Sequence, residues 1–205
     1  MARADAADAL LNAAERLFAE HGIAGVSDRK IAEAAGNSNH SAVGYHFGGR
    51  DPLLRALLER HQKQLVQVRR EMLASADSLT ELVRALVAPQ VRLIESLGIP
   101  SWRARFLASA YQEPVARSVL AGQEGDPLSA RSVFESVCAR LEHLERGVVV
   151  RRAELMGHMV MTVCATLEAR EAELGEAVAW SQAVWFLCDA IEGMLAAPVS
   201  PRPGA

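Results

Sequence analysis

The hydrophobic positions of the chain follow a helical period along most of its length. The apolar residues between positions 5 and 20 share one face of a helix: Leu10, Leu11, Ala14, Leu17 and Phe18. No stretch of the chain sustains the alternation of apolar and polar residues that a half-buried strand requires. The pattern therefore predicts an all-α protein.

Two short helices joined by a polar turn are predicted after this first helix. Ser27 is a candidate N-cap for a helix that runs through Ala35, and the segment 36–39 has the composition of a turn. A second short helix is predicted over residues 39–47, and the glycine pair at 48–49 ends it. This arrangement is typical of a helix-turn-helix unit, in which the second short helix enters the major groove of DNA.

The polar residues of this segment are the candidates for contacts with DNA. Side chains at the start of the second short helix can reach base edges, and cationic or hydroxyl side chains around them can bind phosphates. The candidates are Ser27, Arg29, Lys30, Asn37, Ser38, Asn39, His40, Ser41, Tyr45, His46 and Arg50. An interior position is an equal alternative for His46, and an ordinary surface charge is the alternative for Arg50.

The remaining apolar stripes predict a second, larger helical unit. Asp51-Pro52 opens a long helix that ends near residue 75 and bridges the two units. Pro89 predicts a kink or a break in the helix that follows. Including that helix, the later helices are predicted over residues 78–97, 102–110, 114–120, 126–147, 151–173 and 176–197. The predicted domains are a DNA-binding domain at 1–50, a domain for effector binding and dimerisation at 51–197, and a flexible tail at 198–205.

Composition and charge narrow the class of protein. Half of the residues are hydrophobic and 23% are charged, which argues against a disordered chain. Cys138, Cys164 and Cys188 lie far apart in apolar runs, so we expect reduced core thiols in a cytoplasmic protein. We expect no signal peptide and no membrane span. The net charge of −3 does not indicate DNA binding, so that prediction depends on the helix pattern.

Residues 6–58 resemble the TetR family of regulators. The matching segments are Ala13-Ala14-x-x-Leu17-Phe18-Ala19-x-x-Gly22, Ile31-Ala32-x-x-Ala35-Gly36 and Val43-Gly44-Tyr45-His46-Phe47-Gly48-Gly49-Arg50. The chain departs from the family at Gly44, where the first of two aromatic residues is usual, and in a turn that is one residue longer. The resemblance implies a homodimer formed by the last two helices, and a pocket whose small-molecule effector alters the spacing of the recognition helices.

Candidates for the pocket and for the dimer interface lie in the second unit. Flexible and aromatic side chains suit an apolar effector, and an arginine can anchor an acidic group of it. The candidates are Trp102, Arg105, Phe106, Tyr111, Met156, Met159 and Val160. The candidates for the dimer interface are Val163, Leu167, Trp180, Val184, Leu187 and Ile191. Packing in the chain's own core is the alternative for both sets. We interpret the methionines around His158 as core or pocket wall, and we expect no metal and no cofactor.

These predictions together describe a transcriptional regulator of the repressor type, released from its operator by an effector. The chain has no phosphate-binding loop, no paired metal ligands and no nucleophile elbow, so we do not expect an enzyme. The alternative is a helical binding protein or enzyme that keeps the fold without recognising DNA. Gly44 and the acidic balance of residues 1–60, with seven basic against eight acidic residues, favour that alternative.

Overall fold

The computed structural model describes residues 2–122 and 126–200, and within them it contains ten α-helices and no strand. The prediction of an all-α fold is confirmed. The helices are α1 (Ala2–His21), α2 (Asp28–Ala34), α3 (Ala42–Phe47), α4 (Arg50–Leu73), α5 (Leu79–Ser96), α6 (Arg103–Ala110), α7 (Pro114–Ala121), α8 (Ala130–Arg140), α9 (Arg146–Leu174) and α10 (Trp180–Ala196).

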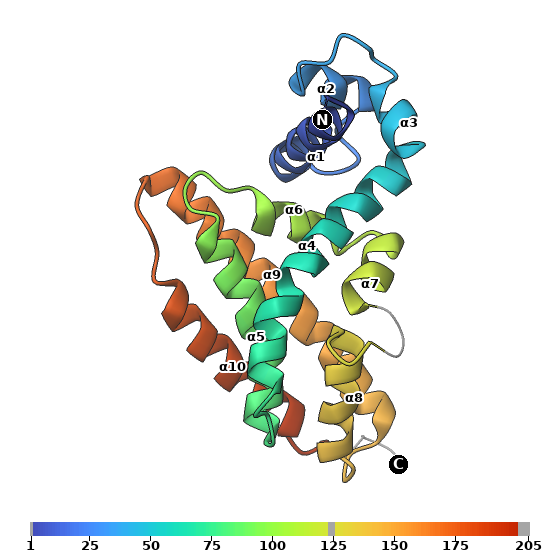
Figure 1. Ribbon diagram of the computed structural model, residues 1–205. Coiled ribbons are helices and arrows are strands. Elements are labelled where there is room, and N and C mark those ends of the chain that lie inside the picture. Colours follow the sequence, from blue (N-terminus) through green and yellow to red (C-terminus); the bar gives the residue numbers. More distant parts are fainter. Residues whose placement is uncertain (1, 123–125, 201–205) are drawn as a thin grey trace.

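Helices α1, α2 and α3 form one end of the molecule, and α4 leads from them into a larger bundle (Figure 1). Within the bundle α5 packs against α4, α8 and α10, and α6 packs against α9. Helix α6 also packs against α1, so the bundle contacts the small end of the molecule at a second place besides α4.

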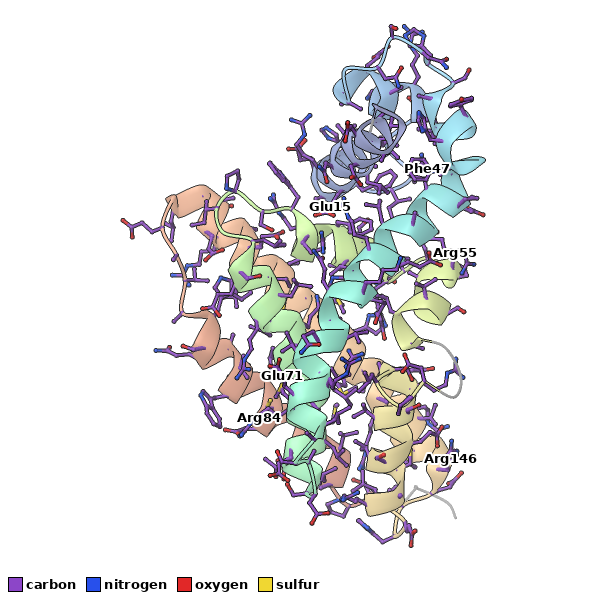
Figure 2. All side chains as sticks on the ribbon, in the orientation of Figure 1. Glu15, Phe47, Arg55, Glu71, Arg84 and Arg146 are labelled. Carbon is purple, nitrogen blue, oxygen red and sulfur yellow. The ribbon has the colours of Figure 1, made fainter. Side chains whose placement is uncertain are left out.

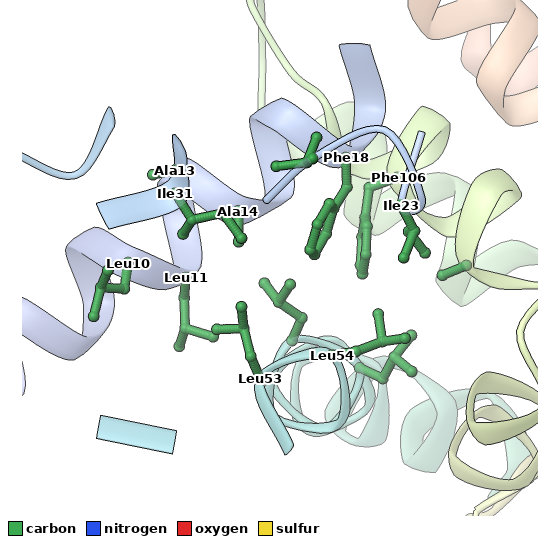
Figure 3. Close-up of a cluster of buried hydrophobic side chains, with 14 of the residues drawn as sticks. Leu10, Leu11, Ala13, Ala14, Phe18, Ile23, Ile31, Leu53, Leu54 and Phe106 are labelled. Atoms are coloured by element: carbon green, nitrogen blue, oxygen red, sulfur yellow. The ribbon is translucent and has the colours of Figure 1, made fainter. Parts of the chain in front are cut away.

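The apolar side chains of the small end continue into the bundle. One core cluster runs from α1 through α4 and includes residues of α6 and α7. Phe18 of α1 and Phe106 of α6 are both fully buried, and their ring centroids lie 6.2 Å apart with nearly parallel planes (Figure 3). The small end is therefore fixed to the bundle by shared apolar packing, which favours a defined orientation between them.

Several predicted helix boundaries need correction. Helix α8 ends at Arg140 because Leu141 to Glu145 form a tight turn, in which the Leu144 amide donates to the Leu141 carbonyl. Gly147 lies inside α9 and does not end a helix. Gly175, with a φ of 68°, ends α9, and α10 begins only at Trp180.

Pro89 does not break α5, which runs as one helix from Leu79 to Ser96. The proline removes one backbone hydrogen bond, but the flanking turns are buried against α4, α8 and α10. Ser78 begins this helix with a capping box: its hydroxyl accepts from the Glu81 amide, and the Glu81 carboxylate accepts from the Ser78 amide.

The cysteines form no disulfide, and Cys164 and Cys188 are buried. Burial raises the pKa of Cys164 to about 12 and that of Cys188 to about 11, so neither is a thiolate at neutral pH. No helix among the described residues is long and apolar enough to cross a membrane. Nor do the described residues bring together three or more side chains of the types that hold a metal ion. Residues 201–205 of the predicted tail lie outside the described residues.

Candidate nucleic-acid interface and internal cavity

Helix α2 begins where the sequence predicts. The Ser27 hydroxyl accepts a hydrogen bond from the Lys30 amide at 3.3 Å, which makes Ser27 the N-cap. Ile31 and Ala32 are buried beneath the helix, and Arg29 and Lys30 are exposed on its outer side. Arg29 also pairs with Glu33 at 2.8 Å, and this hydrogen bond is the main reason why the pKa of Glu33 is lowered.

The turn before α3 is longer than predicted, and α3 begins at Ala42 instead of Asn39. The Asn37 side-chain oxygen accepts from the Asn39 amide at 2.9 Å, and the Asn39 side-chain oxygen accepts from the Ser41 amide at 3.0 Å. Such local bonds between side chain and backbone compete with the helix, so these residues hold a turn. The prediction that Asn39, His40 and Ser41 form the first turn of the second helix is therefore wrong.

The outer surface of the turn and α3 is polar, and its inner surface is apolar. Ala42 and Val43 are buried in the core. Eight of the predicted DNA-binding side chains are exposed: Ser27, Arg29, Lys30, Ser38, Asn39, His40, Ser41 and Tyr45. Asn37, His46 and Arg50 are partly buried. Tyr45 is 64% exposed and meets the His46 ring edge-on, while the His40 ring lies 3.6 Å from the Glu33 carboxylate.

Arg50 is turned toward the protein. Its guanidinium donates to the Asp28 carboxylate at 3.2 Å and to the Ile23 carbonyl, and it lies over the Phe18 ring at 5.1 Å from the centroid. These contacts connect the start of α4 to α1, to the start of α2 and to the segment between them. Substitution of Arg50 would therefore disturb packing as well as any contact with DNA.

A cavity of about 170 Å³ lies between α4, α5, α7, α8 and α9. Of the predicted effector-binding residues, Tyr111, Met156 and Val160 line it. The absence of a side chain at Gly157 of α9 makes room for the Tyr111 side chain, because a Cβ at position 157 would collide with the Tyr111 hydroxyl. The cavity wall also includes residues outside the predicted set: Gln62, Leu65, Arg69, Leu86, Val87 and Gln90.

The other effector candidates lie elsewhere. Phe106 is in the core beside Phe18, and Met159 packs against the core of the bundle. Trp102 lines a separate hollow beside α1. Arg105 donates to the buried Glu168 carboxylate at 3.1 Å. These four residues do not line the cavity, because Phe106 and Met159 pack in the core, Arg105 is held by an internal ion pair and Trp102 faces the other hollow.

Arg69 is an unusual member of the cavity wall because its side chain is a buried cation. It is only 3% exposed and donates to the Leu128 carbonyl at 2.8 Å. Burial lowers the pKa of its guanidinium, and the charge of Asp126 acts in the opposite direction. Its Nε has no hydrogen-bond partner among the described residues.

A chain of polar contacts leads from the cavity to α1. Gln90 Oε1 lies 2.7 Å from His61 Nε2, and His61 Nδ1 lies 3.4 Å from the Arg103 guanidinium. Arg103 in turn pairs with Glu15 of α1 at 2.9 Å, and Arg60 pairs with the other Glu15 oxygen at 2.7 Å. Figure 2 shows Glu15 where α1 meets the bundle.

Arg103 determines which atoms donate and which accept in this series of polar contacts. A guanidinium only donates, so His61 Nδ1 accepts and the ring proton is on Nε2. His61 Nε2 then donates to Gln90 Oε1. The Gln90 Nε2 group is therefore directed away from His61. Burial lowers the pKa of His61 to about 3, with the Arg103 charge as a further cause, so the ring is neutral at neutral pH.

The buried His61 makes stability depend on pH. The unfolded chain binds a proton at this histidine below about pH 6.5, whereas the folded protein does not until about pH 3. The free energy of unfolding should therefore fall as the pH falls through this interval. We expect a loss of about 2 kcal/mol from this group between pH 7 and pH 5. Urea unfolding at several pH values above 5, where Glu33 and Glu81 are not yet protonated, measures it.

His61→Gln should make this dependence on pH shallower even if it lowers stability at every pH. His143→Gln is the matched control, because His143 is exposed in the turn after α8. If His61→Gln kept the same slope of stability against pH as the unchanged protein, the buried neutral histidine would not be its source.

The predicted dimer residues divide into two groups. Trp180, Leu187 and Ile191 are buried in the core of the bundle, so they have no surface to offer to a second subunit. Val163, Leu167 and Val184 are partly buried against the same core. The large apolar side chains exposed on α9 and α10 are instead Val150, Leu155, Leu174, Trp185 and Phe186.

The N-terminal part of the chain is similar in sequence to known bacterial regulatory proteins. Residues 10–57 match the family of bacterial regulatory proteins of the tetR type. Over 78 residues the chain is 33% identical to the HTH-type transcriptional repressor AcnR of Corynebacterium glutamicum, and 32% identical to the AcnR repressor of Corynebacterium efficiens. The similarity covers 38% of this chain and spans 38% of the length of each of these relatives.

The fold extends the comparison to almost the whole chain. A crystal structure from Shewanella sp. PV-4, assigned to the tetR family of transcription regulators, superimposes with a TM-score of 0.60. The superposition covers 93% of this chain and 95% of that protein, at 18% sequence identity, so it shows the shared fold.

A small three-helix end with an outward-facing turn and short helix, joined to a larger helical bundle, defines the class of helix-turn-helix regulatory proteins. Within that class, residues 10–57 match the tetR family, and the bundle shares the fold of a solved structure assigned to that family.

Proposed function

We propose that this protein is a transcriptional repressor that binds operator DNA and leaves it when a small molecule occupies the internal cavity. The observation that carries the DNA-binding part is the exposed polar surface of residues 38–41 and Tyr45, beside the buried Ala42 and Val43. A side chain at Gly44 would meet no atom within 4 Å, so the packing of the chain does not require glycine there. Glycine at this exposed position suits a close approach of a duplex backbone.

In this proposal the small end of the molecule and the larger bundle have different functions. Residues 1–50 bind DNA, and residues 51–197 bind the effector and a second copy of the chain, with α4 as the connection. The AcnR relatives are named as repressors, which favours repression over activation. The protein acts in the cytoplasm, where its operator is, and it does so without catalysing a reaction.

The dimer forms through α9 and α10. Trp185 and Phe186 of α10 are 56% and 64% exposed, and Leu155 and Leu174 of α9 are exposed to a similar degree. Large apolar side chains exposed on two adjacent helices favour an interface with another protein surface. A twofold dimer presents two copies of α3 to successive major grooves, as a near-palindromic operator requires.

Effector binding is coupled to DNA binding through the contacts between the bundle and α1. The cavity-lining Gln90 connects through His61 and Arg103 to Glu15 of α1. An effector that prefers one arrangement of these groups shifts the population of dimers away from the spacing that fits the operator.

Selection of bound duplexes from a random pool, followed by gel-shift titration, tests the DNA-binding proposal. Lys30→Ala should weaken binding to every duplex and reduce the salt dependence, because it removes one phosphate contact. Tyr45→Ala and His40→Ala should each lower the affinity for the selected duplex by about tenfold or more. Arg151→Ala is the control, since Arg151 is an exposed cation on α9.

Phe186→Glu should yield monomers in sedimentation analysis and lose operator binding.

The opposite outcome has a clear form. If no duplex is enriched, or if Lys30→Ala, Tyr45→Ala and His40→Ala all bind as well as Arg151→Ala, the exposed turn and α3 do not read DNA. The chain would then be a helical protein that keeps the fold for another purpose.

A further inference from the structure

The polar groups of the internal cavity limit what it can bind. Most of its wall is apolar, with Leu65, Leu86, Val87, Met156 and Val160 among the lining residues. Two of the lining residues each carry a buried polar atom that has no hydrogen-bond partner among the described residues, namely Gln90 Nε2 and Arg69 Nε. A buried polar group without a partner costs free energy, so both atoms favour a ligand that satisfies them.

Both of these atoms are donors. The chain of contacts from Arg103 through His61 holds the Gln90 oxygen against the histidine, so Gln90 presents its amide hydrogens on the side away from His61. Arg69 presents an N–H group and a positive charge, and it forms no ion pair with any described carboxylate. No described acidic residue lines this cavity. The matching ligand group is an acceptor with a negative charge.

The size of the cavity limits the rest of the ligand. A volume of about 170 Å³ is on the scale of an apolar cavity that holds benzene, which is about 150 Å³. Gln62 and Arg69 also line a neighbouring, more open hollow of about 670 Å³. Arg69 lines both hollows, so a ligand head at Arg69 lies beside the larger one while its apolar body lies along the hydrophobic wall of the smaller one.

We propose that the cavity binds a small amphiphilic carboxylate, whose apolar body fills the space beside Met156 and Val160 and whose carboxylate accepts hydrogen bonds from Gln90 Nε2 and Arg69 Nε. The carboxylate compensates the buried guanidinium, and the apolar body replaces solvent along the hydrophobic wall. This inference rests on the proposed function, because it names the class of molecule that releases the repressor.

Three probes of equal chain length test the proposal by calorimetry on the purified full-length protein without DNA. Octanoate carries the predicted head, octan-1-ol a neutral one and octylamine a cationic one. Octanoate should bind about tenfold or more tightly than octan-1-ol, as expected for hydrogen bonds to a charged group, and octylamine should bind most weakly. Equal binding of octanoate and octan-1-ol, tighter binding of octylamine, or no binding of any probe would overturn the proposal.

Variants locate the head group. Arg69→Met and Gln90→Met should each weaken octanoate binding by about tenfold and leave the binding of octan-1-ol nearly unchanged. Gln90→Glu keeps an oxygen toward His61 but adds a negative charge, so it should bind octylamine in preference to octanoate. Arg92→Met is the control, because Arg92 is an exposed cation on the same helix as Gln90. If Arg69→Met does not fold, the two Gln90 variants still decide the question.

The two proposals fail separately. A protein that binds a selected duplex but discriminates none of the probes remains a repressor with a different effector. A protein that binds octanoate as described but enriches no duplex has the proposed cavity without the proposed function. Release of the duplex by octanoate, and no release by octan-1-ol at the same concentration, is the result expected if both hold.

Discussion

Glu168→Ala should lower the free energy of unfolding by about 3–5 kcal/mol, the range for removing one partner of a buried ion pair. Glu168 belongs to α9 and is 1% exposed. Its carboxylate accepts from the Ser101 hydroxyl at 2.7 Å, from the amides of Ala104 and Arg105 at 3.0 Å each, and from Arg105 Nε at 3.1 Å. Without it, the N-terminal amides of α6 and the Arg105 guanidinium lose their acceptor.

Thermal unfolding followed by circular dichroism measures this effect, which corresponds to a midpoint lower by about 10 °C for a chain of this size. Glu168→Gln keeps one acceptor oxygen and should lose less than Glu168→Ala. Glu173→Ala is the control, since Glu173 is an exposed carboxylate near the end of the same helix. A Glu168→Ala protein as stable as the control would mean that α6 does not depend on this carboxylate.

Glu15→Ala should be the second large loss, again about 3 kcal/mol or more. The Glu15 carboxylate pairs with Arg103 at 2.9 Å and with Arg60 at 2.7 Å, and the Arg103 side chain is only 5% exposed. Removing the carboxylate leaves the Arg103 cation buried without its counter-charge. Urea unfolding measures the loss, and Glu20→Ala, an exposed carboxylate of the same helix, serves as control.

A double-mutant cycle separates the ion pair from other effects of the substitution. Arg103→Leu should also destabilise the protein, but the double variant Glu15→Ala with Arg103→Leu should be less destabilised than the sum of the two single losses, because no buried cation remains. Strictly additive losses would show that the two side chains act independently. The same variants are informative for function, since Glu15 and Arg103 join α1 to the chain of contacts that reaches the cavity.

The sequence predicted those parts of the fold that depend on short-range physics. Ser27 and Ser78 begin their helices as expected, because an N-cap needs only a side-chain oxygen and an amide two or three residues later. The start of α3 was misplaced, since Asn37 and Asn39 bind the backbone of the turn and thereby delay the helix. That competition is local, but its outcome depends on small energy differences that composition does not reveal.

The sequence predicted the candidate DNA-binding segment more completely than it predicted the cavity. The exposed turn and α3 lie in the segment that the sequence predicted to contact DNA. The prediction was possible because the polar residues of this segment are flanked by apolar residues at helical spacing. The cavity was found only in part. His61 and Arg69 lie four residues before and after Leu65 on the buried face of α4, which was the available signal. A polar residue on an apolar helix face indicates an internal partner or a ligand, but which of the two depends on neighbouring helices.

The sequence by itself determined that this protein is helical, that two short helices joined by a turn follow its first helix, and that its N-terminal part matches a family of regulators. Periodicity, caps and motif spacing are properties of neighbouring residues, so they can be read from the sequence. Only the tertiary structure decided that Arg50 and Arg105 face internal partners, that Leu187 and Ile191 are core, and that Gln90 and Arg69 meet at one cavity. The physical reason is that burial and pairing join side chains from helices far apart in the chain, and their cost or gain exists only once those helices pack.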